Sequence, residues 1–132
     1  MKLPHTGSIL LVEQHDILDE NTVEAYYTVK SDHPILKDHF PHMAIWPGVY
    51  LIEGMCQTAG LHAMSQVDSN IPATPMITTV DKAKFRRAVL PGQTIKYVAT
   101  RAYSRRKHVF YDCVVYNNEQ KVAEATVGLT AR

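Results

Sequence analysis

The segment from Pro47 to Gln66 limits most strongly what this chain can fold into. Proline fits the first turn of a helix, where its missing N–H has no helical partner, so the pattern predicts a helix over residues 47–66. Apolar residues such as Leu51 and Leu61 cover nearly every face of this helix. A helix that is apolar all round is covered by other parts of its domain. The rest of the chain must therefore supply elements that surround it.

Alternating polarity predicts the first strands. The odd-numbered residues from Val23 to Val29 are apolar and share one face of residues 22–30, as in a strand with one buried side. Residues 8–17 are also rich in β-forming residues. The two segments predict an antiparallel pair joined through residues 18–21.

Most of the chain after the helix also has the composition of β-strands. We predict strands over residues 76–85, 94–106, 108–117 and 121–131. A turn over residues 117–120 joins the last two strands. Between the helix and the first of these strands, Pro72 and Pro75 end the helix and begin the strand.

One central helix and about six antiparallel strands predict an α+β fold in which the sheet wraps around the helix, the hot-dog architecture. The chain has 132 residues, which is one domain's worth, so we expect a single domain over residues 1–132. Hydrophobic residues make up 45% and charged residues 20%, which excludes an intrinsically disordered chain.

Charge and hydropathy exclude several classes of partner. The formal net charge is +1, so the whole molecule has no strong attraction for nucleic acid or a membrane surface. No segment approaches the length of a membrane span, and the N-terminal residues lack a signal-peptide cleavage site, so we expect a cytoplasmic protein. Cys56 and Cys113 have no metal-ligand spacing and are interpreted as core thiols.

Glu53 is a carboxylate in the middle of the apolar helix. Burying an unpaired carboxylate is costly, so it must be paired, protonated or placed in a wet pocket. In one interpretation it faces a subunit boundary and is hydrogen-bonded there, and Gln57, one turn on, orients it. In the other, apolar surroundings raise its pKa and make it a general acid near neutral pH.

Two short motifs precede Glu53: His39-Phe40-Pro41 before the helix and Trp46-Pro47-Gly48 at its start. A histidine can act as a base at physiological pH. Gly48 allows a substrate to approach the free N–H groups of a helix N-terminus, which stabilise negative charge on a carbonyl oxygen. Base, oxyanion donor and acid thus fall within one segment, although a lone histidine is more often structural and a Pro-Gly pair more often a turn.

The sequence resembles the FabZ-type 3-hydroxyacyl-acyl carrier protein dehydratases of the hot-dog superfamily. The resemblance covers most of the chain and is carried by three stretches: LPHTGSILLVE near the N-terminus, DHFPHMAIWPGVYLIEGMCQTAG across the helix, and VDKAKFRRAVLPGQ after it. It implies dehydration of a 3-hydroxyacyl thioester to the trans-2-enoyl thioester, without a metal or a redox cofactor. The pathway is left open among fatty acid, polyketide and aryl polyene synthesis.

The resemblance also implies roles for individual residues. His39 corresponds to the base that removes the α-proton, Gly48 to the N–H donor for the thioester carbonyl, and Glu53 to the residue that handles the β-hydroxyl. The residues expected to contact substrate are Phe40, Pro41, Trp46, Pro47 and Gln57.

Two positions depart from the family pattern. His42 stands where the family has glycine, and Trp46 where it has methionine or phenylalanine. We expect His42 to point outward and Trp46 to pack at the mouth or wall of the acyl tunnel. A metal site on His39 and His42 is disfavoured, because Pro41 between them excludes a helical pair three residues apart.

The resemblance implies two kinds of partner. In the family each active site lies at a dimer boundary, so a homodimer is the minimum and a trimer of dimers fits as well. The second partner is an acidic acyl carrier protein with its phosphopantetheine arm. Two basic clusters are candidates for steering it, although a solvated strand face explains them equally well: Lys82, Lys84, Arg86 and Arg87, and Arg105, Arg106 and Lys107.

Three rival functions stay open. A hot-dog thioesterase would use a helix carboxylate to activate water but would not need His39. A FabA-type dehydratase and isomerase carries aspartate at the position of Glu53, which favours simple dehydration here. The third rival is a non-catalytic subunit that forms a heterodimer with a related active dehydratase, and the retained His39 and Glu53 argue against it.

Overall fold

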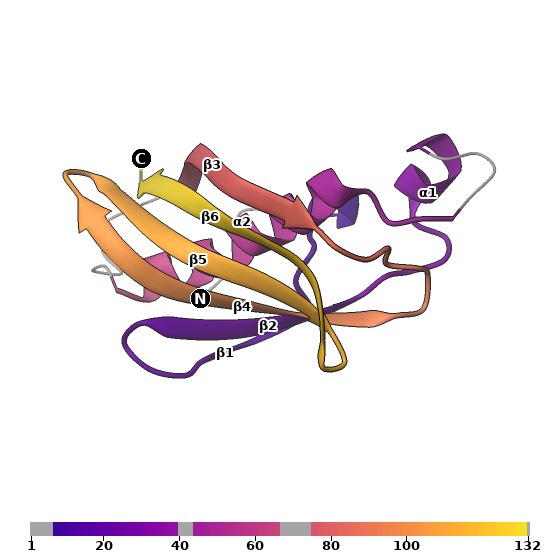
Figure 1. Ribbon diagram of the computed structural model, residues 1–132, viewed down its shortest axis with the longest axis horizontal. Helices are drawn as coiled ribbons and strands as arrows, with labels where there is room; N and C mark the ends of the chain where they lie inside the picture. The colour runs from indigo at the N-terminus through magenta and orange to yellow at the C-terminus, as the bar shows by residue number, and fades with distance from the viewer. Residues whose placement is uncertain (1–6, 40–43, 67–74, 132) are drawn as a thin grey trace.

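The computed structural model describes residues 7–39, 44–66 and 75–131 (Figure 1). The elements follow in the order η1 (Gly7–Ile9), β1 (Gln14–Ile17), β2 (Thr22–Thr28), α1 (Pro34–His39), α2 (Gly48–Ser65), β3 (Pro75–Phe85), β4 (Thr94–Arg105), β5 (His108–Asn117) and β6 (Gln120–Ala131). The predicted division into one long helix and a set of strands is therefore confirmed. The expectation of a single domain over residues 1–132 stays a prediction.

All six strands form one antiparallel sheet in the order β1-β2-β4-β5-β6-β3. The sheet curves, and α2 lies along one of its faces in contact with β2, β3, β4, β5 and β6 (Figure 1). This arrangement confirms the predicted α+β hot-dog fold. Within the described residues, no helix is long and apolar enough to cross a membrane.

Helix α2 begins where the sequence predicts. Pro47 has extended backbone angles, φ −63° and ψ 139°, and no side chain caps the helix start. The middle of the helix, from Gly54 to His62, is buried against the sheet, whereas Val49 in the first turn is 66% exposed. The core thus covers the centre of the helix and leaves its N-terminal turn open.

The alternation in β2 is confirmed, because Val23, Ala25 and Tyr27 are buried while the residues between them are not. The segment before it differs from the prediction, since only Gln14–Ile17 of residues 8–17 form a strand. The reason is the Gln57 amide, which accepts the Leu11 N–H at 2.9 Å and donates to the Ile9 carbonyl at 2.7 Å. These side-chain bonds occupy backbone groups that a strand partner would otherwise take.

Helix α1 was not anticipated from the sequence. It begins at Pro34, and the Ile35 N–H donates to Nδ1 of His33 at 3.2 Å. Proline in the first position and a side-chain acceptor just before it are ordinary helix-start signals. The local sequence His33-Pro34 therefore contained the signals that mark the start of this helix.

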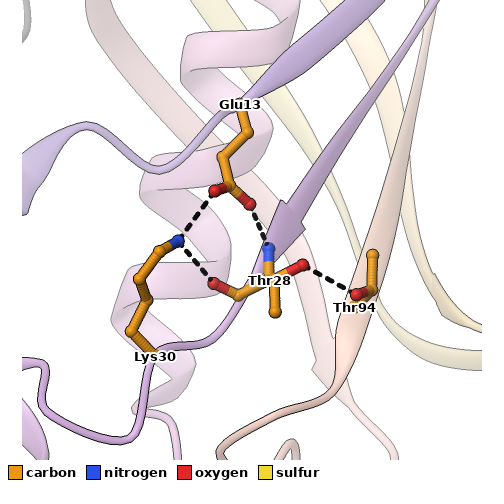
Figure 2. Close-up of polar contacts among 4 residues, drawn as sticks. All are labelled: Glu13, Thr28, Lys30 and Thr94. Carbon is orange, nitrogen blue, oxygen red and sulfur yellow. Dashed lines mark hydrogen bonds and ion pairs between the residues drawn. The ribbon is translucent and has the colours of Figure 1, made fainter.

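A polar cluster joins the segment before β1, the end of β2 and the start of β4 (Figure 2). Glu13 accepts the Thr28 N–H at 2.6 Å and forms an ion pair with Lys30 at 2.7 Å, and the Thr28 and Thr94 hydroxyls lie 2.7 Å apart. Although partial burial opposes it, hydrogen bonding from Lys30 and Thr28 lowers the pKa of Glu13. These contacts hold the chain before β1 against the end of β2 and the start of β4.

Candidate active site

Gly48 is the first residue of α2 and lies directly beneath an aromatic ring. A Cβ placed on Gly48 would be 2.9 Å from Cε1 of Phe85, so a larger residue would collide with the ring. Both residues line an open hollow of about 450 Å³, to which Arg86 and Arg87 also contribute. The uncapped start of a helix, with its partial positive charge, thus faces a hollow with two arginines at its wall.

Trp46 is almost fully buried, with an exposed fraction of 2%. Its ring packs edge-on against His33 at 4.8 Å and Tyr50 at 5.1 Å between ring centroids, and lies 5.7 Å from Tyr27. It also lines the hollow at Gly48. Trp46 therefore combines core packing with a position at the wall of the candidate site.

Glu53 is half-buried on α2 and lines a second hollow, of about 190 Å³. The other walls of this hollow come from Cys56 and Gln57 of α2, the first residues of β3, and Leu129 of β6. Burial and the nearby Glu53 charge raise the pKa of Cys56 to about 12. Cys56 therefore stays a thiol, and Glu53 is the one carboxylate among the described residues that line this hollow.

Gln57 lies one turn after Glu53 and is buried, with an exposed fraction of 1%. Its carbonyl oxygen and its amide nitrogen bond the backbone at Leu11 and Ile9. It lines the same hollow as Glu53 while holding the N-terminal segment against α2. The sequence indicated that these two residues share a side of the helix but not that the N-terminal segment lies beside them.

The predicted base is only partly described. Helix α1 ends at His39, whose side chain lies outside the described part of the structure. Phe40, Pro41 and His42 lie outside the described residues as well. The roles predicted for these four residues therefore stay predictions.

The two basic clusters lie at opposite ends of the molecule. Arg86 and Arg87 follow β3 near the start of α2. Arg105 ends β4, and Arg106 and Lys107 form the turn to β5, beyond the other end of α2 (Figure 1). The remaining members, Lys82 and Lys84, belong to β3, with Lys82 in a left-handed conformation (φ 55°) at a register shift against β6. Within one chain only the first cluster borders the Gly48 hollow.

Gly48 and Glu53 face different sides of α2. Five residues along a helix of 3.6 residues per turn correspond to a rotation of about 140° beyond one full turn. In agreement with this, the hollow at Gly48 does not include Glu53, and the hollow at Glu53 does not include Gly48. A single chain therefore presents the predicted oxyanion donor and the predicted acid in two separate places.

Strand β3 borders both hollows and forms one edge of the sheet. It pairs only with β6 in the described structure, and apart from Pro75 its residues are exposed. Four of them are large and apolar: Met76, Ile77, Val80 and Phe85. A long apolar edge of this kind is an unsatisfied pairing surface.

Comparison with known proteins identifies one family to which the chain is similar. A family model described as FabA-like domain matches residues 3–126. The 3-hydroxyacyl-[acyl-carrier-protein] dehydratase FabZ of Rhodopseudomonas palustris strain HaA2 is 38% identical over 131 residues, covering 96% of this chain and 85% of the relative. FabZ of Bradyrhizobium sp. strain ORS 278 is 37% identical, covering 96% of this chain and 84% of the relative. The chain belongs to the FabA-like family, among its FabZ-type dehydratases.

Solved structures agree on the fold. One chain of the dehydratase heterocomplex ApeI:P from Xenorhabdus doucetiae superposes with a TM-score of 0.79 at 18% identity, covering 98% of this chain and 88% of that one. A mutant thioesterase, PA1618 from Pseudomonas aeruginosa, has a TM-score of 0.69 at 13% identity, covering 89% of this chain and 79% of that one. At these identities the structures establish the shared hot-dog fold alone.

Proposed function

We propose that this chain dehydrates 3-hydroxyacyl thioesters carried on acyl carrier protein to trans-2-enoyl thioesters. The names of its FabZ relatives support the reaction, and the positions of Gly48 and Glu53 support the mechanism. No step requires a metal or a redox cofactor, because the reaction is an elimination of water.

In the proposed mechanism three groups act together. His39 removes the α-proton, and the N–H groups at the start of α2, beginning with Gly48, stabilise the negative charge that develops on the thioester oxygen. Glu53 donates a proton to the β-hydroxyl, so the C–O bond breaks and water leaves. The electron pair of the broken C–H bond becomes the second bond between the α- and β-carbons.

The observation that carries the proposal is the separation of Gly48 and Glu53 into two hollows of one chain. A substrate whose carbonyl lies at Gly48 needs a carboxylate from another source. A second copy supplies it if His39 and Gly48 of one subunit face Glu53 of the other. The site is then complete only in a dimer.

The β3 edge supports this assembly. Pairing of two β3 strands would satisfy their free backbone groups and bury exposed apolar residues such as Ile77 and Val80. It would also bring the hollows that β3 borders in each subunit toward the shared boundary. We therefore propose a homodimer as the working unit, with a trimer of dimers as a compatible larger assembly.

A heterodimer is the alternative assembly. The Xenorhabdus structure is described as a dehydratase heterocomplex, so a related dehydratase-like subunit is a second candidate for the partner at the β3 edge. Purification of the chain alone distinguishes the two, because only a homodimer is active without another subunit.

For the carrier protein we propose a docking surface formed by Arg86 and Arg87. They line the hollow at Gly48, into which the phosphopantetheine arm must deliver the thioester. Their charge complements an acidic carrier protein and accelerates association. A cytoplasmic location and a place in fatty acid synthesis or in a related polyketide or aryl polyene pathway complete the proposal.

The direct test is mass spectrometry of 3-hydroxyacyl groups of several lengths on acyl carrier protein. The proposal predicts loss of one water from the carrier-bound species, with no free thiol released. Glu53→Gln should remove most of this activity, about a hundredfold or more. Release of free thiol would instead identify a thioesterase, and an intact substrate with the purified homodimer would contradict the proposal.

A further inference from the structure

A third cavity, of about 220 Å³, lies at the C-terminal end of α2, opposite the end that carries Gly48. Met64 in the last turn of α2 and Gln66, the residue that follows the helix, form one side. The ends of β4 and β6 and the start of β5 form the other, beside the β4–β5 turn (Figure 1). The proposed dehydration mechanism uses no residue of this cavity.

The cavity is apolar at its floor and cationic at its rim. Tyr111 and Leu129 are buried beneath it, with exposed fractions of 0% and 2%. Arg101 and Lys107 stand at the rim together with the Ser104 hydroxyl. None of the described residues that line the cavity is acidic, so this lining favours a ligand with an apolar body and an anionic end.

Arg101 is held in place by its side chain and Lys107 by its backbone, and no carboxylate of the described residues neutralises either charge. The Arg101 guanidinium donates to the Asn21 side-chain oxygen at 3.0 Å, and its backbone N–H donates to the Asn21 carbonyl at 2.7 Å. The Lys107 carbonyl accepts the Thr130 hydroxyl at 3.1 Å. Within the described residues, neither cation forms an ion pair with a carboxylate. Each positive charge is therefore available to an anion.

The cavity adjoins the hollow that contains Glu53. Pro75 and Leu129 line both spaces. The Pro75 ring lies against α2 at Gly60, where a Cβ would be 3.0 Å from its Cγ. The helical rise places Met64 about 16 Å beyond Glu53 along the helix. An extended acyl chain that runs from Glu53 along the shared walls of Pro75 and Leu129 would thus end between Arg101 and Lys107.

We propose that this cavity binds the far end of the acyl chain and selects chains that end in a carboxylate. The inference rests on the proposed function, because it assigns the acyl chain to the hollow at Glu53. A terminal carboxylate would meet two cations that have no ion pair within the described residues, at a solvated rim where a charge-assisted hydrogen bond is made without deep burial of charge. A methyl terminus would find no such partner.

The test uses pairs of N-acetylcysteamine thioesters that have the same chain length and end in either a methyl group or a carboxylate. Unreactive saturated acyl thioesters measure equilibrium binding, and the matching 3-hydroxyacyl thioesters measure dehydration. Arg101→Gln and Lys107→Gln each remove one rim cation. Lys121→Gln, at the turn between β5 and β6, removes the same charge away from the cavity and serves as the control.

Each rim variant should weaken binding of the carboxylate-ended chain by roughly tenfold. This is the loss of affinity expected when one hydrogen bond to a charged group is removed. Binding of the methyl-ended chain should be unchanged, and Lys121→Gln should affect neither. Equal effects on both chains, or none, would overturn the inference. Because the binding measurement does not require turnover, a protein that dehydrates neither substrate would refute the proposed function while binding still decides the role of the cavity.

Discussion

The hydroxyl of Tyr97 lies where a side chain on Gly54 would begin. A Cβ on Gly54 would overlap both the hydroxyl and the ring of this buried tyrosine of β4. Only glycine allows the helix to approach the sheet this closely. Because Gly54 follows Glu53 directly, the same contact sets how far the candidate acid stands from β4.

We therefore expect Gly54→Ala to lower the free energy of unfolding by about 3 kcal/mol, because neither the helix nor the buried ring has room to move. Urea denaturation of the two proteins measures this. Tyr97→Phe is the matched control: it removes only a hydroxyl that has no hydrogen-bond partner in the described part of the chain, so it should cost little. A Gly54→Ala protein as stable as the wild type would show that the contact does not constrain α2.

Assembly should depend on the β3 edge. Val80→Lys places a charge on this edge, and we expect it to shift the protein to monomers and to abolish dehydration. Ile17→Lys is the matched control, because Ile17 lies on the opposite edge strand β1 with a similar exposed fraction, 39% against 43% for Val80. Sedimentation equilibrium should find only the Val80 variant monomeric, and a dimeric, active Val80→Lys protein would exclude β3 pairing.

Stability should fall in mild acid because of His62. This residue is fully buried on α2, and its Nδ1 lies 2.7 Å from the Tyr111 hydroxyl. Burial lowers the pKa of His62 below 6.5, with a smaller contribution from the Arg101 charge, while backbone groups of Asp19 and Glu20 and the Asp19 charge oppose the shift. Below pH 6.5 the unfolded chain therefore binds a proton that the folded chain does not, so stability decreases as the pH falls.

The slope cannot exceed about 1.4 kcal/mol per pH unit, the value for one proton. It should appear as the pH falls below about 6.5 and level off below the lowered pKa of His62 in the folded chain, where both states bind the proton. The double variant His62→Leu/Tyr111→Phe removes both hydrogen-bonding partners together and should flatten this part of the profile. Thermal unfolding between pH 5 and 8 compares the two proteins, and parallel profiles would mean that His62 does not titrate as described.

The carrier protein should distinguish the two basic clusters. Replacing Arg86 and Arg87 with glutamine should lower kcat/KM several-fold for carrier-bound substrate and leave a small free thioester unaffected, since only the former is steered by charge. The effect should shrink as salt is added. The same change at Arg105 and Arg106, at the other end of the chain, provides the comparison. A larger loss from that pair would move the docking surface to the β4–β5 turn.

Periodicity made most of the fold predictable. Pro47 and the apolar run after it predicted α2 to within one residue at each end, and alternation predicted β2, because both signals depend on neighbours along the chain. The shortness of β1 was not predictable in this way, since it depends on Gln57 bonding to residues far away in sequence. Helix α1 was missed although His33 and Pro34 marked its start.

The sequence named candidate site residues but did not give their arrangement. Spacing placed Gly48 and Glu53 on different sides of one helix. The hollows that they border are formed by residues distant in sequence, such as Phe85 and the start of β3. The two basic clusters look equivalent in sequence and lie at opposite ends of the fold. Such long-range relations depend on strand order and register, which local patterns do not encode.

The central claim is that one active site uses His39 of one subunit and Glu53 of another. It is tested most directly by purifying His39→Ala and Glu53→Gln separately, mixing them under conditions that allow subunit exchange, and measuring dehydration of a carrier-bound 3-hydroxyacyl thioester. Each variant alone should be nearly inactive. Hybrid dimers should regain activity, because one of their two sites carries both intact residues. If exchange is demonstrated by mass spectrometry and no activity returns, the shared site is contradicted.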